Sequence, residues 1–296
     1  MEETGYPWWG ALLLAVATSL AALQLLLSRL RQLALDIPNH RSLHETPVPR
    51  TGGWAMVVGV FVALLWAPVA MSAVTVTAFA LLLAVSLADD LRTVSARLRF
   101  AVQAGSVALL LVDLAPGLAW WLMPILLIGG VWVVNLYNFM DGMDGFAGSM
   151  TAIGFGTLAG ISAFRGEAEL AGICGIMAAS SMVFLYYNWP AARIFLGDAG
   201  STSIGLAVFA VSVYGWQQSV FSPLVPLIIF SPFWVDATYT LLRRMYNRER
   251  WWEAHRQHLY QRSALSVGTR KTLGIELTVM LGTSLAAISV VALGLA

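Results

Sequence analysis

Long apolar runs separated by short polar breaks make up most of this chain. A membrane-spanning helix needs about 20 apolar residues, and the runs 54–88 and 100–134 are each too long for one span. Each run has a break near its middle, at Pro68 and at 113–117, so each is expected to form a helical hairpin. The apolar segments are then 8–28, 54–70, 72–88, 100–115, 118–137, 147–164, 169–187, 201–217, 220–242 and 273–295. This pattern predicts about ten transmembrane helices.

The composition also indicates a chain that lies mostly in lipid. Its 296 residues are 58% hydrophobic and 11% charged, and the mean hydropathy is +0.75, which is outside the usual balance of a soluble domain. There is no internal repeat and no linker long enough to separate domains. The expected fold is all-α and polytopic, with one integral-membrane domain over residues 1–296 in the lipid bilayer.

Two further features limit the class of protein. Cys174 is the single cysteine, so no disulfide within the chain and no cysteine-based zinc site is expected. The first apolar run, 8–28, is too long for a signal-peptide core, and Glu2 and Glu3 stand where a signal peptide carries positive charge. We therefore expect this run to be retained as the first helix.

The basic residues test the number of helices, because short cytoplasmic loops collect Lys and Arg. Ten helices with the N-terminus outside would place five segments in the cytoplasm. These segments are 29–53, 89–99, 138–146, 188–200 and 243–272. Of the 17 Lys and Arg residues, all except Arg165 fall within them. The pattern therefore predicts that both termini are periplasmic.

Five aspartates lie at the predicted cytoplasmic ends of helices. An aspartate at the centre of a span costs about 2.5–3.5 kcal/mol on insertion scales, and a water-accessible helix end largely avoids that cost. Two of the five are adjacent, and two anions repel unless a cation lies between them. A single one could be a solvated loop acid, but together they indicate a binding site. The five are Asp89, Asp90, Asp141, Asp144 and Asp198.

One stretch repeats an oxygen-bearing side chain at every third position. On a straight helix this stripe would drift by about 60° per step, so its first and last members would face opposite sides. Gly142 and Gly145 are expected to break the helix and let the chain curl around a site. The four residues of the stripe are Asn135, Asn138, Asp141 and Asp144.

Asp198 lies between glycines, just before a predicted helix. Glycines allow a backbone to approach a phosphate or a metal, and a helix start offers free N–H groups to an anion. An ordinary helix cap is the alternative. An all-oxygen set of ligands suits Mg²⁺, which takes one or two carboxylates together with substrate phosphates, and Mn²⁺ is a second choice.

The last predicted cytoplasmic loop supplies the positive charge. It contains the segment His255-Arg-Gln-His-Leu-Tyr-Gln-Arg262. A basic loop beside a membrane is often an electrostatic anchor for anionic lipid. Two histidines and a tyrosine at close spacing also suggest recognition of phosphate and sugar.

Several stretches together resemble the polyprenyl-phosphate N-acetylhexosamine-1-phosphate transferases of glycosyltransferase family 4. This superfamily includes the translocase that makes lipid I and the enzymes that initiate O-antigen synthesis. The histidine segment is most similar to the branch that starts O-antigen chains in pseudomonads. The matching stretches are Asp36-Ile-Pro-Asn-His-Arg-Ser-Leu-His44, Pro47-Val-Pro-Arg-Thr-Gly-Gly53, Asp89-Asp90, Asn135-Leu-Tyr-Asn-Phe-Met-Asp-Gly-Met-Asp-Gly145, Asn188-Trp-Pro-Ala, Phe195-Leu-Gly-Asp-Ala-Gly-Ser201 and the histidine segment.

The resemblance implies ten helices and a cytoplasmic active site in the bacterial inner membrane. It also implies that the five aspartates are the functional acids. We assign catalytic roles to Asp89, Asp90, Asp141 and Asp144, and metal binding to Asp198 and Asp90. The candidate substrate-binding residues are His44, Arg50, Asn135, Asn138, Asn188, His255, Arg256, His258 and Arg262.

The implied reaction transfers an N-acetylhexosamine 1-phosphate from a UDP-sugar to undecaprenyl phosphate and releases UMP. Direct attack by the lipid phosphate, with Asp89 assisting its deprotonation, is favoured over a phosphorylated aspartate intermediate. The identity of the sugar stays open, as does a homodimer, and no nucleic-acid polymer is expected as a partner. Two other classes are a transporter and an inert scaffold. The candidate midplane acids of a transporter are Asp113 and Asp236, and Asp236 follows an expected kink at Ser231–Pro232.

Overall fold

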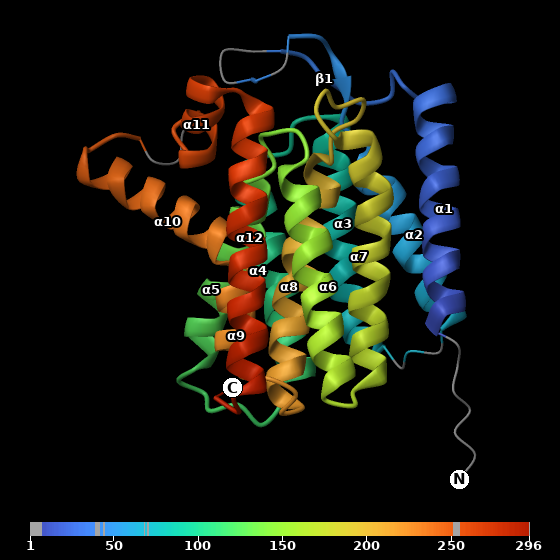
Figure 1. Ribbon diagram of the computed structural model, residues 1–296, viewed down its shortest axis with the longest axis vertical. Helices are drawn as coiled ribbons and strands as arrows, with labels where there is room; N and C mark the ends of the chain where they lie inside the picture. The colour runs from blue at the N-terminus through green and yellow to red at the C-terminus, as the bar shows by residue number, and fades with distance from the viewer. Residues whose placement is uncertain are drawn as a thin grey trace.

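The structure is a computed structural model that describes residues 8–38, 42–43, 45–67, 69, 71–250 and 255–295. Helices dominate these ranges (Figure 1). They are α1 (Trp8–Arg29), α2 (Gly52–Trp66), α3 (Ala73–Leu91), α4 (Ala96–Leu114), α5 (Met123–Phe139), α6 (Phe146–Phe164), α7 (Ala168–Asn188), α8 (Gly197–Gln217), α9 (Leu224–Ile229), α10 (Ser231–Tyr246), α11 (Leu259–Val267) and α12 (Thr269–Ala292). The strands β1 (Leu35–Asp36) and β2 (Val48–Pro49) pair antiparallel.

Both long apolar runs divide where the sequence predicts. The first splits into α2 and α3, and Ser72 caps α3 by accepting a hydrogen bond from the Thr75 N–H at 3.0 Å. The second splits into α4 and α5, which pack against each other as a hairpin. In contrast, α2 packs mainly on α1, α7 and α8, and α3 mainly on α4 and α8.

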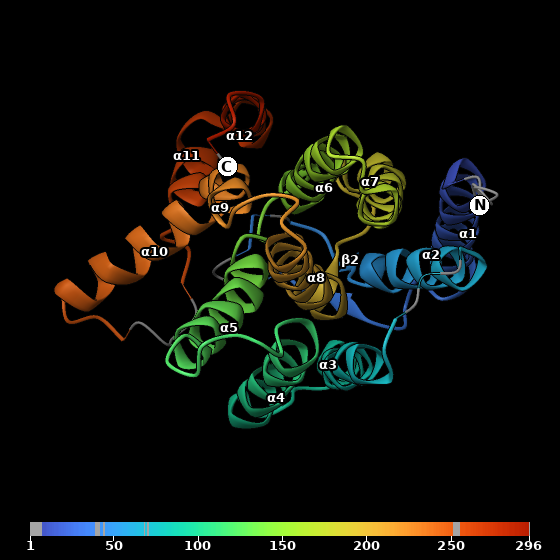
Figure 2. The same ribbon diagram turned by 90° about the horizontal axis from the view of Figure 1, so that it is seen from below.

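The apolar segment 220–242 forms two helices with a break between them. Helix α9 ends at Ile229, and α10 starts at Ser231 and leans out of the bundle (Figures 1 and 2). Pro232 is the reason, because a proline has no N–H to continue the preceding helix but fits the first turn of a new one. The break falls where the Ser231–Pro232 kink is expected.

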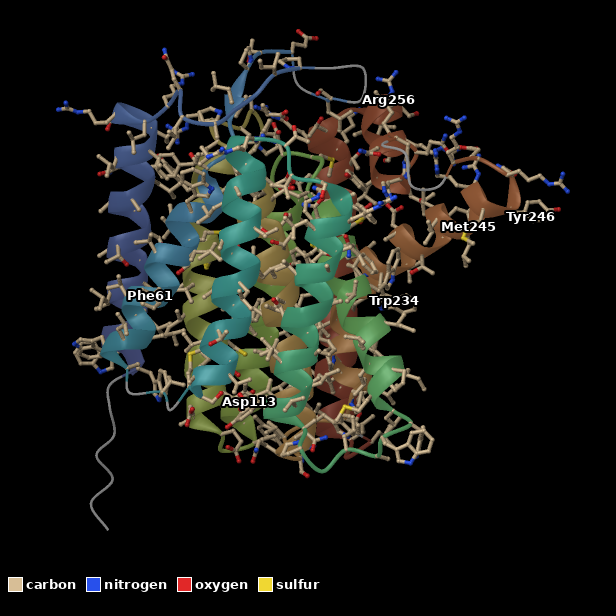
Figure 3. All side chains as sticks on the ribbon, turned by 180° about the vertical axis from the view of Figure 1, so that it is seen from behind. Phe61, Asp113, Trp234, Met245, Tyr246 and Arg256 are labelled. Atoms are coloured by element: carbon tan, nitrogen blue, oxygen red, sulfur yellow. The ribbon has the colours of Figure 1, made fainter. Side chains whose placement is uncertain are left out.

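Six of the described helices are long and apolar enough to cross a membrane: α1, α3, α6, α7, α8 and α12. Helices α2 and α5 are apolar but shorter. Large apolar side chains such as Phe61 (Figure 3), Ile128 and Leu285 are exposed, as expected where lipid is the solvent. The fold is therefore an all-α, multi-pass membrane bundle.

Helix α8 lies at the centre of the bundle (Figure 2), and small residues let its neighbours approach closely. A Cβ on Gly205 would lie 2.8 Å from the Val134 Cα in α5. At the start of α8, a Cβ on Gly53 would lie 2.2 Å from the Gly200 Cα. These close contacts hold α8 against α5 and against the start of α2.

The strands lie at one end of the bundle, which we call the β end (Figure 1). Here the segment that precedes α2 joins the loop that precedes α8. The Phe195 N–H donates to the Pro49 carbonyl at 2.7 Å, and the Gly52 N–H donates back to the Phe195 carbonyl at 2.8 Å. The helix ends that carry the five aspartates meet at this end, so the prediction that they share one face is confirmed.

Candidate active site at the β end

Asp90 is buried at the end of α3, where it caps the start of α8. Its Oδ1 accepts from the Asp198 N–H at 2.8 Å, and its Oδ2 accepts from the Ala199 N–H at 3.1 Å. The Trp54 indole donates to Oδ2 at 2.8 Å. A carboxylate suits these donors because a helix start carries free N–H groups and positive partial charge. Asp90 therefore fixes where Asp198 stands.

Asp89 and Asp198 face a shared cation. Arg99 Nη1 lies 2.6 Å from Asp89 Oδ2 and 3.2 Å from Asp198 Oδ2. The Val94 N–H also donates to Asp89 Oδ1 at 2.7 Å. The position between these two carboxylates therefore favours positive charge, as expected for anions this close together.

The asparagine stripe lies beside this pair. Asn138 donates from Nδ2 to Asp198 Oδ1 and to Ser201 Oγ, both at 3.0 Å. Asn135 instead donates to Gln103 Oε1 at 2.7 Å and to the carbonyl four residues earlier in its own helix. Asn138 therefore belongs to the acidic cluster, whereas Asn135 ties α5 to α4.

The loop between α5 and α6 carries Asp141 and turns at Gly145, whose φ is +76°. This confirms that the glycines break the helix. Asp141 is partly buried, and burial together with the charges of Asp198 and Asp90 raises its pKa well above the ordinary value. The loop thus adds another carboxylate to the cluster.

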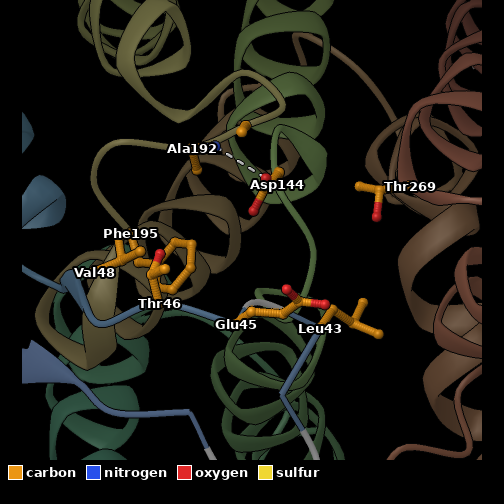
Figure 4. Close-up of a pocket in the computed structure, with 9 residues that line it drawn as sticks. Leu43, Glu45, Thr46, Val48, Asp144, Ala192, Phe195 and Thr269 are labelled. Atoms are coloured by element: carbon orange, nitrogen blue, oxygen red, sulfur yellow. Dashed lines mark hydrogen bonds between the residues drawn. The ribbon is translucent and has the colours of Figure 1, made fainter.

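Asp144 faces a separate hollow next to the cluster (Figure 4). Its Oδ2 accepts from the Ala192 N–H at 3.0 Å. Asn188, which is buried, ties the same two loops together, since it accepts from the Gly145 N–H and donates to the Ile194 carbonyl, both at 2.9 Å. The hollow is lined by Leu43, Glu45, Thr46, Val48, Asp144, Ala191, Ala192, Phe195 and Thr269.

Arg50 binds the end of α3. Its Nη2 donates to the Asp90 carbonyl at 2.9 Å and lies 3.4 Å from the Asp89 carbonyl. A cation at a helix C-terminus satisfies carbonyls that lack helical partners. Arg50 therefore stabilises the C-terminal end of α3, which carries both aspartates, by binding their backbone carbonyls.

The histidine segment lies at the β end, between α10 and α12. His258 Nδ1 lies 3.3 Å from Asp236 Oδ1. Burial and the positive charge of its neighbours lower the pKa of His255 to about 4, so this ring is neutral at pH 7. Its Nδ1 accepts from the Gln257 N–H at 3.3 Å, which leaves Nε2 to carry the proton.

Tyr260 joins the histidine segment to the loop between α5 and α6, which carries Asp141 and Asp144 and which we call the acidic loop. Its hydroxyl donates at 3.0 Å to the carbonyl of Phe139, which is the last residue of α5. A Cβ on Gly142 would lie 2.3 Å from the same hydroxyl oxygen, so this glycine permits the contact. Segments more than a hundred residues apart in the sequence thus form one site.

The other candidates lie at the margins or outside the described residues. Arg256 and Arg262 are exposed, and Arg256 lies at the β end (Figure 3). His44 lies outside the described residues. Asp113 lies at the opposite end of the bundle, where Ser72 and Thr75 donate to it (Figure 3), so it is not part of this site.

The chemistry of the donors fits Mg²⁺. The described residues contain no group of three or more His, Cys, Asp or Glu side chains arranged to hold a metal alone. Mg²⁺ needs only one or two carboxylates when substrate phosphates and water complete its octahedron. Asp89 and Asp198 already share one Arg99 nitrogen within 3.2 Å, and the Asp198 side chain is the more exposed of the two, at 26% against 9%.

Arg99 and Trp54 contact the key aspartates but were not among the predicted site residues. We expected a loop over 89–99, whereas α4 begins at Ala96 and turns Arg99 toward the acids. The signal was Ser95, a residue type that favours helix starts, which caps α4 through the Leu98 N–H. Trp54 looked like an ordinary member of an apolar run.

Comparison with known proteins gives consistent relatives. The family model described as Glycosyl transferase family 4 matches residues 71–216. A probable undecaprenyl-phosphate N-acetylglucosaminyl 1-phosphate transferase from Bacillus subtilis is 30% identical over 249 residues, which cover 77% of this chain and 69% of that protein. The decaprenyl-phosphate N-acetylglucosaminephosphotransferase of Mycolicibacterium smegmatis is 32% identical over 71% of this chain and 62% of its own. The undecaprenyl-phosphate alpha-N-acetylglucosaminyl 1-phosphate transferase of Escherichia coli is 25% identical over 76% and 68%.

The fold and the site define a multi-pass bacterial membrane protein with a carboxylate-rich site at one end of its helix bundle. A transporter is not favoured, because the acids gather at a helix-end surface and the relatives are transferases. The chain belongs to glycosyl transferase family 4. The resemblance drawn from the sequence motifs is confirmed at this level.

Proposed function

We propose that this protein transfers an N-acetylhexosamine 1-phosphate from a UDP-sugar to undecaprenyl phosphate, giving undecaprenyl-diphospho-N-acetylhexosamine and UMP. The observation that carries the proposal is the pair Asp89 and Asp198 on either side of Arg99, in a chain of this family. The names of the relatives support a polyprenyl phosphate acceptor and make UDP-N-acetylglucosamine the first donor to test. The specific link to the pseudomonad branch stays a prediction.

The reaction exchanges one phosphoanhydride for another, so it needs no ATP. An oxygen of the lipid phosphate attacks the sugar-linked phosphorus of the donor, and the bond from that phosphorus to the UMP oxygen breaks. Because two anions must meet, the protein's task is to neutralise charge and align the groups. Asp89, at the end of α3 beside the lipid, accepts the proton of the lipid phosphate in this proposal. A phosphorylated aspartate intermediate is the alternative mechanism.

We assign Mg²⁺ to Asp198, and Asp89 keeps the role of proton acceptor. A bound Mg²⁺ would neutralise phosphate charge and hold the donor for in-line attack. Asp90, which the sequence suggested as a second ligand, has each oxygen engaged by a backbone N–H, so we assign it to positioning Asp198. Asn138 orients the Asp198 carboxylate from the other side through its 3.0 Å hydrogen bond.

The donor is assigned to the histidine segment and the acidic loop that it contacts. His258 and Arg262 would bind the phosphates of the UDP-sugar, with Arg256 at the rim. Arginine suits this role because its planar fork matches phosphate oxygens. His255, being neutral, can donate a hydrogen bond from Nε2 but supplies no charge.

We place the β end in the cytoplasm of a bacterial inner membrane, with ten spans and both termini periplasmic. The distribution of Lys and Arg supports this orientation, because all except Arg165 fall in the segments predicted to be inside. A soluble nucleotide-sugar would then reach the site from the cytosol. A homodimer stays a prediction.

The decisive experiment is release of UMP by the purified protein. Undecaprenyl phosphate and a panel of UDP-sugars are supplied in detergent or in vesicles, and UMP and the lipid product are measured. We expect UMP only when both substrates are present, with an equal amount of diphospholipid sugar. If no UDP-sugar yields UMP above the level without lipid, the proposed reaction is wrong. That negative result is the one expected of a transporter or a scaffold.

A further inference from the structure

Asp236 lies in α10, outside the residues assigned to the reaction, yet it is buried and accepts several hydrogen bonds. The Leu259 N–H donates to its Oδ1 at 2.8 Å, and the Tyr260 N–H donates to its Oδ2 at 3.0 Å. The Thr240 hydroxyl donates to Oδ1 at 3.0 Å. Asp236 therefore holds the first free N–H groups of α11 with both of its oxygens.

Helix α11 gains support from Asp236 in addition to its own capping box of His258 and Gln261. It has only nine residues, Leu259–Val267, and an isolated helix of that length is marginal in water. A carboxylate at its start satisfies unpaired donors and interacts favourably with the helix dipole. Asp236 therefore stabilises the helix that carries Arg262, and it fixes where that helix begins.

The same carboxylate orients His258. The ring turns Nδ1 toward Asp236 at 3.3 Å, and the same side chain accepts from the Gln261 N–H in the capping box of α11. The ring also stacks on Phe139 and on Tyr260, with centroids 6.3 and 5.8 Å apart. A carboxylate on one side and aromatic rings on its faces restrict His258 to one orientation.

Asp236 is connected to the acidic loop through Tyr260. The N–H of this residue bonds to Asp236, and its hydroxyl bonds to the Phe139 carbonyl at the end of α5. Tyr260 is fully buried, and its hydroxyl lies against Gly142, where a Cβ would come within 2.3 Å of it. A shift of the start of α11 would therefore move the loop that carries Asp141.

The inner face of α10 is specialised for this task. Asp236, Thr240 and Arg244 recur every four residues and are all buried, whereas Trp234 and Met245 on the outside are exposed (Figure 3). Arg244 bonds to Glu249 at 2.9 Å and to the Arg250 carbonyl at 2.8 Å. One helix face thus holds both the chain that precedes the histidine segment and the segment itself.

We propose that Asp236 is a positioning residue for donor binding: it fixes the start of α11, orients His258, and through Tyr260 holds the histidine segment against the Asp141 loop. This inference rests on the proposed role of that segment in binding the UDP-sugar. Asp236 does not touch the substrate in this proposal. Its loss acts through His258, Arg262 and Tyr260.

The test compares Asp236→Asn with Asp113→Asn in the full-length protein. The amide NH₂ group introduced by this substitution cannot accept a hydrogen bond, whereas both carboxylate oxygens of Asp236 accept one from a backbone N–H of α11. The start of α11 should therefore be less firmly held. Asp113 is the control, because it too accepts hydrogen bonds, here from two hydroxyl groups, but it lies at the opposite end of the bundle (Figure 3). Steady-state kinetics use UDP-N-acetylglucosamine, or the best donor of the panel, with undecaprenyl phosphate.

We expect Asp236→Asn to raise the KM for the donor about tenfold, the size expected for loss of hydrogen bonds to a charged group. The KM for the lipid and the Mg²⁺ requirement should stay within about twofold, and Asp113→Asn should leave both KM values unchanged. Tyr260→Phe removes one hydroxyl and keeps the ring, so it should raise the donor KM by about threefold. This second variant carries the test if Asp236→Asn does not insert.

The outcomes separate this inference from the function on which it rests. If His258→Ala raises the donor KM but Asp236→Asn and Tyr260→Phe do not, the positioning role is wrong and the donor assignment stands. If His258→Ala leaves the donor KM unchanged, both are wrong. Equal losses of kcat and of thermal stability in Asp236→Asn and Asp113→Asn, without a change in KM, would reduce Asp236 to a general structural role and overturn the inference.

Discussion

The backbone N–H of Asp198 donates to the Oδ1 of Asp90 at 2.8 Å. This hydrogen bond joins two aspartates that lie more than a hundred residues apart, and it separates the roles of Asp90 and its neighbour Asp89. Asp90 is directed at a helix start, whereas Asp89 faces Arg99 and Asp198. Two residues that look equivalent in the sequence are therefore expected to respond differently to substitution.

Asp90→Asn should lower both stability and turnover, whereas Asp89→Asn should mainly lower turnover. The first leaves an amide group facing backbone donors, a change that costs about 1–3 kcal/mol and should lower the Tm by several degrees. The measurement is thermal unfolding in detergent alongside the UMP assay. A Tm for Asp90→Asn equal to that of the wild type would contradict the capping role.

Removal of metal should abolish activity, because the proposed phosphate chemistry needs a divalent cation, which Asp198 would hold. EDTA should reduce UMP release to background, and Mg²⁺ or Mn²⁺ should restore it. Asp198→Asn should insert normally but lose turnover by about 100-fold or more. If Asp198→Asn keeps activity close to that of the wild type, Asp198 is not a metal ligand.

Donor recognition and chemistry should separate in the kinetics. Arg262→Lys and His258→Ala should raise the donor KM, since a lysine cannot reproduce the planar fork of arginine. Asp89→Asn should instead reduce kcat at saturating donor. Both substrates must be varied. The opposite pattern, with Asp89→Asn affecting donor affinity alone, would show that the two roles are reversed.

The stability of the metal-free protein should depend on pH through Asp141. Burial and neighbouring carboxylates raise its pKa, so the fold favours the neutral acid. That contribution is fully present below the ordinary value near 3.8 and is lost as the pH rises through the raised pKa. In EDTA, Asp141→Asn should therefore have a higher Tm than the wild type at pH 7–8. Each kcal/mol by which the ionised Asp141 destabilises the wild type corresponds to a Tm difference of about 2–4 °C.

The difference should disappear near pH 4, where the wild-type carboxyl is protonated. Differential scanning fluorimetry at a series of pH values provides the measurement, and Asn138→Ala serves as a variant without a titrating group. A Tm difference that is constant across this pH range would exclude titration of Asp141 as its cause.

Membrane orientation can be tested with engineered cysteines, because the native Cys174 is buried. Arg97→Cys lies in the first turn of α4 near the β end, and Glu167→Cys lies between α6 and α7 at the other end; both positions are exposed. An impermeant maleimide added to intact cells should label Glu167→Cys and not Arg97→Cys. Labelling of Arg97→Cys alone would place the site in the periplasm.

The sequence by itself determined the class of fold and the identity of most acids in the site. Long apolar runs can satisfy their backbone groups in lipid only as helices, so the helices follow from hydropathy, and the breaks at Pro68 and near Pro116 follow from local chemistry. The placement of Asp89, Asp141 and Asp198 at helix ends was readable for the same reason. The bend at Pro232 was expected, but its outward direction was not.

Only the tertiary structure decided which of these residues act together. Asp89 and Asp90 are neighbours in the sequence, yet a helix directs successive side chains about 100° apart, and the start of α8 selects one of them as its cap. The roles of Arg99 and Asp236 became visible only through their contacts with α8 and α11. Such contacts depend on how whole helices pack, and no local pattern records that packing.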